Sequence, residues 1–162
     1  MSLTAAQHAM RMTGIGASEI GTVAGLVPYA KPIDVWLVKR GLREPFEGNQ
    51  ATRMGTALEP AIADIYAAEY LGPGERVAQP SEAWPDAVDG TLRHPDHPWV
   101  LASPDRAVMV DGKVVRLVEI KTAGPRTAYL WGDAHDAVPN GYRAQVEWQM
   151  AVTGVPVVDL VV

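Results

Sequence analysis

Two acidic residues and a lysine lie at positions where a β-hairpin would bring them together. Asp105 lies in one largely apolar segment, and Glu119 and Lys121 lie in the next. The Asp111-Gly112 pair between these segments is a strong signal for a tight hairpin turn. Because side chains alternate along a strand, Glu119 and Lys121 share one face and Ile120 points to the other. We therefore expect Asp105, Glu119 and Lys121 to meet.

These three residue types suit a particular chemistry. Two carboxylates are hard oxygen ligands for Mg²⁺ or Mn²⁺, and a nearby lysine can orient a water or stabilise developing negative charge. Together they can support metal-assisted hydrolysis of a phosphodiester. The alternative is a solvated hairpin with a cross-strand ion pair. Against this alternative, residues 117–121 come close to the continuous apolar run of a strand buried on both faces, where charges need partners or a metal.

Composition limits the class of protein. The chain has 162 residues, 48% of them hydrophobic, which predicts one globular domain with a sizeable core over residues 1–162. It has no cysteine, which excludes disulfides and thiolate metal sites. No apolar run approaches the length of a membrane span, and no secretory signal is visible. We therefore expect an intracellular protein with no membrane partner.

The overall charge argues mildly against a nucleic-acid partner. The net charge is −5, whereas binding to nucleic acid is driven by neutralisation of phosphates. An acidic metal site contributes to this total, and bound cations reverse its sign locally. Basic residues gather at Lys39, Arg40 and Arg43, and we interpret them as cations at a helix C-terminus rather than as a DNA-binding patch.

The elements that must position these residues are helices followed by short strands. Helices are predicted over 4–12, 19–24, 32–40, 53–70 and 142–152, strands over 99–110, 114–122 and 157–162, and a helical turn near 127–131. Residues 72–98 are predicted to be irregular, with short strands. This order indicates an α/β or α+β fold with a small mixed sheet flanked by helices. Because the chain ends inside an apolar strand, we expect a C-terminal truncation or a missing tail.

Three local details of the helices are also predicted. Ser18 follows a glycine turn and is expected to N-cap the helix over 19–24. Pro60 either kinks the helix over 53–70 or begins it, because the residue before a proline avoids the α region. One helical face is expected to pack on the core, and its residues are Met54, Leu58, Ile62 and Ile65.

Five motifs in order along the chain resemble one family. They are Arg11-x-x-Gly14-Ile15-Gly16-Ala17-Ser18-Glu19-Ile20, Gly55-Thr56-Ala57-Leu58-Glu59-Pro60, Ser103-Pro104-Asp105-Arg106, Glu119-Ile120-Lys121-Thr122 and residues 144–154. The set resembles the YqaJ-like viral recombinase family, which includes the phage lambda exonuclease and belongs to the PD-(D/E)XK nucleases. The resemblance spans about residues 11–162 and implies the restriction-endonuclease-like core of those enzymes.

The resemblance also implies an activity. It is the Mg²⁺-dependent digestion of one strand of double-stranded DNA from 5′ to 3′, with Mn²⁺ able to substitute. It further implies a homotrimeric ring around DNA, a phage single-strand annealing protein as partner, and a place in the cytoplasm of a bacterial host or prophage carrier. Two alternatives stay open: an endonuclease or RecB-like single-strand nuclease, and a catalytically silent DNA-binding phage protein. The absence of cysteine removes the iron–sulfur members of the RecB-like group.

The family's metal and catalytic residues carry over to this chain by motif. By resemblance, Asp105, Glu119 and the carbonyl of Ile120 are metal ligands. Lys121 is the residue that positions the attacking water and stabilises the pentacoordinate phosphate. Glu59 matches the helix glutamate that holds a second metal directly or through water.

The remaining matches concern the substrate. Gln145 is expected to hydrogen-bond the nucleophilic water or the scissile phosphate. Gln149 lies one turn further on the same face, where a functional role and a structural one remain equally open. Arg11 and Ser18 match positions that bind the terminal 5′-phosphate. The tryptophans are expected in core or rim packing, although one of them could wedge the DNA at the strand junction; they are Trp36, Trp84, Trp99, Trp131 and Trp148.

Overall fold

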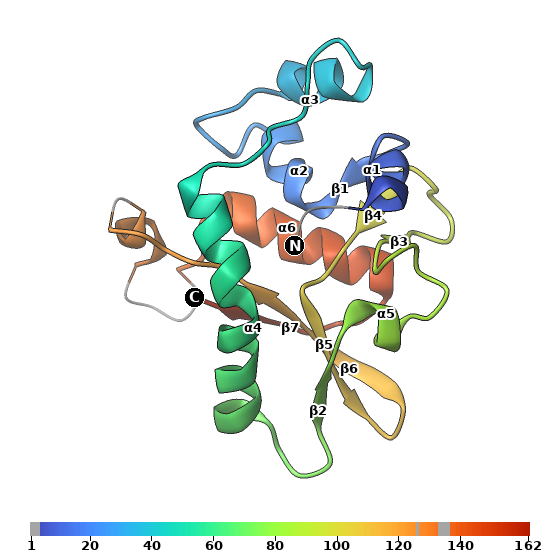
Figure 1. Cartoon of the computed structure of the whole chain (residues 1–162), viewed down its shortest axis with the longest axis vertical. Helices are drawn as coiled ribbons and strands as arrows, with labels where there is room; N and C mark the ends of the chain where they lie inside the picture. The colour runs from blue at the N-terminus through green and yellow to red at the C-terminus, as the bar shows by residue number, and fades with distance from the viewer. Residues whose placement is uncertain (1–3, 126, 133–136) are drawn as a thin grey trace.

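The computed structural model describes residues 4–125, 127–132 and 137–162, and it shows two small β-sheets among helices (Figure 1). The helices are α1 (Ala5–Arg11), α2 (Ala17–Val23), α3 (Pro32–Lys39), α4 (Gln50–Tyr70), α5 (Pro80–Ala83) and α6 (Asn140–Thr153), with a 3-10 turn η1 (Ala128–Trp131). The strands are β1 (Ile15–Gly16), β2 (Arg76–Ala78), β3 (Leu92–Arg93), β4 (Val100–Ala102), β5 (Arg106–Val110), β6 (Lys113–Ile120) and β7 (Val158–Val161). Within the described residues, no helix is long and apolar enough to cross a membrane.

The larger sheet contains the predicted hairpin. Its strand order is β2-β5-β6-β7, with β7 parallel to β6 and the other pairs antiparallel. Asp111 and Gly112 both have positive φ, 49° and 76°, as a two-residue turn of the I′ type requires. The predicted mixed sheet flanked by helices is confirmed.

The first hairpin strand is divided, which the sequence analysis did not predict. The segment 99–110 forms β4 and β5, and β4 pairs with β1 and β3 in a second, three-stranded sheet. The break falls at Ser103-Pro104-Asp105, where Pro104 has no N–H to donate to a strand ladder. Asp105 therefore lies where the chain passes from one sheet to the other.

Helices α4 and α6 pack against different sheets. α4 packs through Ala63 and Tyr66 on Val108, Val118 and Ile120 of the larger sheet. α6 packs on α2 and β4 through Val152 and the partly buried Trp148, in a cluster with Ala17, Val100 and Ala102. As Figure 1 shows, α4 runs along the larger sheet while α6 crosses beside the smaller one.

The predicted core face of α4 is wrong at three of its four positions. Met54, Leu58 and Ile65 are 55%, 43% and 56% exposed, and Ile62 is partly buried. The fully buried positions are the small Ala63 and the aromatic Tyr66, because the hydroxyl of Tyr66 finds polar partners under the helix. Pro60 lies inside α4, so the alternative in which the helix begins there is also wrong.

Ser18 does not cap α2. The helix begins at Ala17, and the backbone N–H of Gly16 donates to Glu19 Oε2 at 2.8 Å. Because Glu19 satisfies the free N–H before the helix, the helix starts earlier than predicted. Ser18 is therefore the second helical residue, and its exposed side chain is free to contact Arg11.

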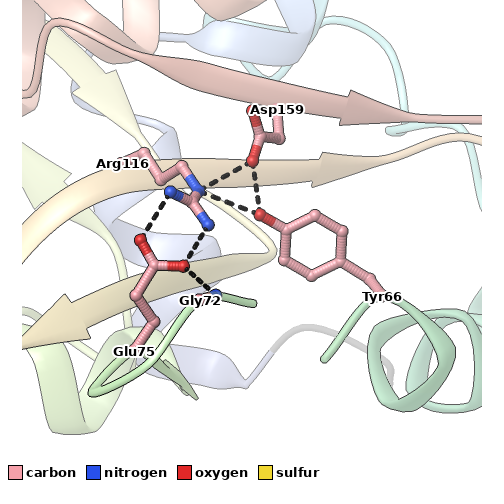
Figure 2. Close-up of polar contacts among 5 residues, drawn as sticks. All are labelled: Tyr66, Gly72, Glu75, Arg116 and Asp159. Carbon is pink, nitrogen blue, oxygen red and sulfur yellow. Dashed lines mark hydrogen bonds and ion pairs between the residues drawn. The ribbon is translucent and has the colours of Figure 1, made fainter. Parts of the chain in front are cut away.

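An ionic cluster ties α4 to the middle of the sheet (Figure 2). Arg116 on β6 donates two hydrogen bonds to Glu75, at 2.8 and 2.7 Å, and its Nε lies 2.8 Å from Asp159 Oδ2 on β7. The hydroxyl of Tyr66 bonds to Asp159 and accepts from Arg116 Nε. Burial, followed by the hydrogen bond to Asp159, raises the pKa of Tyr66 to about 12. We call these four residues the Arg116 cluster.

Candidate functional site

Asp105 and Glu119 lie together at the end of β6. Asp105 Oδ2 accepts the backbone N–H of Ile120 at 2.8 Å, which fixes this carboxylate beside the strand. Glu119 is 2% exposed, and Lys121 Nζ lies 2.5 Å from its Oε1. Ile120 points instead into the core cluster under α4. The structure therefore brings together the three residues expected from the hairpin, and we call them the carboxylate–lysine site.

Two glutamines of α6 complete the surroundings of Glu119. Gln145 Nε2 donates to Glu119 Oε1 at 2.5 Å, and Gln149 Nε2 donates to Oε2 at 2.6 Å. They lie one turn apart and so reach the same carboxylate. Gln149 is fully buried, and among the described residues its Oε1 has no hydrogen-bond partner. Gln149 is thus a buried partner of Glu119 rather than part of an exposed polar face.

The electrostatics of the site favour added positive charge. Burial, and then the charge of Glu119, raise the pKa of Asp105 to about 7, although the N–H of Ile120 and the amine of Lys121 oppose this. Burial alone would lower the pKa of Lys121, but the charge and hydrogen bond of Glu119 outweigh it and raise that pKa. Lys121 therefore stays protonated, and one cation faces two carboxylates.

A divalent cation fits this donor set. The carboxylates of Asp105 and Glu119 are hard oxygen donors, and burial followed by the charge of Glu119 raises the pKa of Asp105, so a further cation would stabilise its anion. Taking two charges out of water is costly unless they are paired or coordinate a metal. Asp105, Glu119 and the carbonyl of Ile120 would hold such an ion.

Glu59 lies beside this pair but is engaged elsewhere. Its Oε1 is 2.6 Å from Nη1 of Arg106, which is 7% exposed and also donates to the backbone oxygen of Asp105 at 2.5 Å. In the part of the chain that the structure describes, no three acidic or histidine side chains converge in a metal-binding group. The structure therefore does not bring Glu59 into the carboxylate–lysine site.

The two residues assigned to a 5′-phosphate are in contact. Arg11 Nη2 donates to Ser18 Oγ at 2.9 Å. Lys39 fixes this corner, because its Nζ lies 2.7 Å from Glu19 and donates to the backbone oxygen of Arg11 at 2.5 Å. Lys39 is the last residue of α3, in agreement with its interpretation as a helix C-terminal cation.

One cavity joins the two groups of residues. It has a volume of about 200 Å³, and its polar lining comes from both groups and from β4 and its neighbours: Arg11, Ser18, Thr91, Ser103, Asp105, Glu119, Lys121 and Gln145. A larger cavity of about 440 Å³ lies between α4 and β2. Three arginines along that cavity are each paired with a glutamate: Arg106 with Glu59, Arg76 with Glu82 and Arg116 with Glu75.

Three further residues lie around the site that were not predicted from the sequence. Arg106 follows Asp105 directly, so its place in the motif was a usable signal. Tyr142 lies three residues before Gln145 and therefore on the same side of α6, where it contacts Lys121. Thr91 bonds to Ser103 at 2.9 Å in the cavity wall, and nothing in its local sequence marks it.

The fold of this chain is similar to that of known exonucleases. Two crystal structures share this α/β fold. They are an alkaline exonuclease, LHK-Exo from Laribacter hongkongensis (27% identity, TM-score 0.63), and LHK-Exo in complex with dAMP (26%, 0.66). Each match covers 94% of this chain and 70% of that one. The core is thus the nuclease-type fold expected from the motifs.

The family follows from the sequence itself. The model of the YqaJ-like viral recombinase domain matches residues 7–156, so the chain belongs to that family. An uncharacterized protein of Bacillus subtilis (strain 168), YqaJ, is 29% identical over 146 residues, which cover 89% of this chain. The chain spans only 40% of the length of that relative.

Proposed function

We propose that this domain is a metal-dependent deoxyribonuclease of phage-type recombination, which digests one strand of duplex DNA from 5′ to 3′. One observation carries the proposal: a single cavity contains both the Arg11–Ser18 pair and the carboxylate–lysine site. The family and the likeness to an alkaline exonuclease support a nuclease. That exonuclease also binds dAMP, which is the kind of mononucleotide such digestion releases.

The residues of the site suit phosphodiester hydrolysis. Bound Mg²⁺ or Mn²⁺ would polarise the phosphate and lower the pKa of the attacking water. Asp105, Glu119 and the Ile120 carbonyl would hold the ion. Lys121, protonated and anchored on Glu119, would stabilise charge on the phosphate oxygens. Gln145 lines the same cavity, where its amide can orient the water.

Glu59 has a more distant part in this scheme. Its carboxylate is paired with Arg106, so it would reach a second cation only by giving up that ion pair. A buried arginine without its counter-ion is costly. We therefore propose one strongly held cation at Asp105 and Glu119, with Glu59 as the outer ligand of a weaker second one.

The Arg11–Ser18 pair would give the reaction its direction. A guanidinium can bind phosphate through two parallel hydrogen bonds, and the serine hydroxyl adds another donor. A terminal 5′-phosphate held there would place the next linkage at the carboxylate–lysine site. The family resemblance supports, as further proposals, a ring-shaped homotrimer, a single-strand annealing partner and a cytoplasmic location.

A cleavage assay with matched substrates tests the proposal. Linear duplex DNA, with and without a 5′-phosphate, is compared with a closed circle and with single strands, in Mg²⁺ or EDTA. We expect mononucleotides from linear duplex in Mg²⁺, faster release from phosphorylated ends, and no product in EDTA. Arg11→Ala should remove the preference for phosphorylated ends, whereas Arg40→Ala, an exposed arginine outside the cavity, should keep it.

Each alternative function has its own outcome in this assay. Cutting of the circle would indicate an endonuclease, and preference for single strands would indicate a RecB-like nuclease. Binding of duplex without cleavage in either metal would indicate a silent DNA-binding protein. Any of these three results would overturn the proposed exonuclease.

A further inference from the structure

Two aromatic rings extend outward from Lys121. Tyr142 lies in the first turn of α6, and Trp131 ends η1. Their rings are stacked, with centroids 5.1 Å apart and planes inclined by 14°. Lys121 Nζ lies over the Tyr142 ring, 5.4 Å from its centroid. The indole of Trp131 is therefore linked to the carboxylate–lysine site through one intervening ring.

These rings belong to an exposed part of the molecule. Trp131 is half-buried, while its neighbours in η1, Tyr129 and Leu130, are 78% and 48% exposed. In Figure 1, η1 (orange) stands out from the body beyond the end of β6. Aromatic side chains that only filled a core would be largely buried. Trp131 and Tyr142 are each only partly buried, so within the described residues the stack lies at the surface.

The stacked rings come from two separate elements, η1 and α6, and Tyr142 lies beside Lys121. We call Trp131 and Tyr142 the aromatic shelf.

We propose that the aromatic shelf binds the unpaired nucleobase beside the scissile phosphate, with the base stacked on Trp131. The inference rests on the proposed function, because a nucleic-acid substrate supplies the base. Most side chains that line the cavity of about 200 Å³ are polar or charged and none is aromatic, so we place the attached base outside it. Lys121 lines the cavity and also lies over the ring of Tyr142, so a phosphate at Lys121 would leave its base next to the shelf.

Stacking also answers an energetic need of the reaction. A base that leaves a duplex loses its neighbours, and enzymes that act on extruded bases compensate by stacking them on aromatic side chains. Such a contact stabilises the bound base and tolerates every base, since each has a π-face. A shelf without base-specific hydrogen bonds would suit digestion that continues through any sequence.

Fluorescence of a modified base tests the proposal. A duplex carries 2-aminopurine as its 5′-terminal nucleotide, because stacking on an indole quenches this base. All proteins carry Glu119→Gln, which removes a proposed metal ligand so that no hydrolysis competes. We expect quenching in this protein and in the matched control Tyr129→Ala, and loss of quenching in Trp131→Ala. If Trp131→Ala fails to fold, Trp131→Phe takes its place in the test. This variant keeps a planar ring and should still bind the duplex tightly.

An abasic end makes the test specific for stacking. Trp131→Ala should bind the normal duplex about tenfold more weakly than the protein with Trp131. On a duplex with an abasic 5′-terminal residue, Trp131→Ala and the protein with Trp131 should bind equally tightly. Retained quenching in Trp131→Ala, or equal weakening on both duplexes, would overturn the shelf. A change in oligomeric state with quenching intact would assign the rings to a protein contact instead.

The two proposals can fail separately. If wild-type protein cleaves linear duplex DNA but the quenching does not depend on Trp131, only the shelf is wrong. If no duplex is cleaved and quenching still depends on Trp131, the shelf stands and the nuclease assignment fails.

Discussion

Strand β6 carries two ionic clusters that have the same charge and opposite character. The Arg116 cluster joins one arginine to Glu75 and Asp159, and the carboxylate–lysine site joins Lys121 to two acids. Each contains one cation and two carboxylates. The first faces α4, and the second faces α6.

The two clusters differ in how far their own hydrogen bonds satisfy the carboxylates. Arg116 binds Glu75 through two bonds, and these bonds, with the N–H of Gly72, lower the pKa of Glu75 (Figure 2). Asp105 is buried beside Glu119, and its pKa rises to about 7. In the Arg116 cluster, hydrogen bonds within the fold stabilise the anion of Glu75, whereas in the carboxylate–lysine site burial and the charge of Glu119 destabilise the anion of Asp105. Composition alone does not separate a structural ion cluster from a cation site; burial and bond geometry do.

The largest expected contrast between the clusters is in activity. Lys121→Ala should reduce cleavage of duplex DNA about 1,000-fold, because it removes the charge that stabilises the phosphate. Binding of DNA, measured by fluorescence anisotropy, should persist. Lys113→Ala, at the exposed start of the same strand, is the control and should cleave normally. A wild-type rate in Lys121→Ala would remove the distinction between the clusters.

The pH dependence of stability should have opposite signs at the two clusters. Between its ordinary value of 3.8 and about 7, Asp105 binds a proton in the folded protein but not in the unfolded chain. As the pH rises through this window, the unfolding free energy of the metal-free wild type therefore falls relative to that of Asp105→Asn, by roughly 2–4 kcal/mol. Urea denaturation in EDTA measures this difference.

For Glu75→Gln, we expect the opposite pH dependence of the unfolding free energy. The pKa of Glu75 is lowered in the folded protein, so its stabilisation is present above the ordinary pKa of the group and is lost as the pH falls. Wild type should be more stable than Glu75→Gln at neutral pH, and the difference should shrink in acid. The same sign at both positions would contradict the proposed contrast.

Glu59 tests where the boundary of the cation site lies. Glu59→Gln should lower the unfolding free energy by about 2 kcal/mol, because it leaves the buried Arg106 without its counter-ion. Glu69→Gln, exposed on the same helix, is the control and should change little. Calorimetry with Mn²⁺ should still find the strongly held ion. Loss of that ion would place Glu59 inside the carboxylate–lysine site.

The smallest effect is expected at the Arg116 cluster itself. Arg116→Met should lower the melting temperature by about 3 °C, because the partly exposed cluster loses its central donor. The cleavage rate of the folded protein should not change. Arg43→Met removes an exposed pair with Asp34 and should shift the melting temperature less. Loss of cleavage in Arg116→Met would show that the clusters are coupled.

The parts of the site that the sequence predicts are those set by local geometry. Strand alternation and the Asp111-Gly112 turn place Asp105 against Glu119 over a short separation. The rotation of α4 depends instead on the partners that Tyr66 finds across the sheet, which no periodicity encodes. The pairing of Glu59 with Arg106 likewise joins residues 47 positions apart. The order of the motifs identified Glu59 as a candidate residue, but it did not predict that Glu59 pairs with Arg106.

The route by which the chain closes the cation site follows from the same hairpin. The contact between Asp105 and Ile120 spans 15 residues and closes through a two-residue turn, whereas the glutamines of α6 reach Glu119 across 26 and 30 residues. Short loops close with less loss of entropy and form sooner than long ones. During folding, the two carboxylates should therefore meet before α6 docks to shield them. Before α6 docks, the newly formed hairpin would expose two neighbouring carboxylates to solvent. Divalent cations in the surrounding medium would bind them and favour formation of the hairpin.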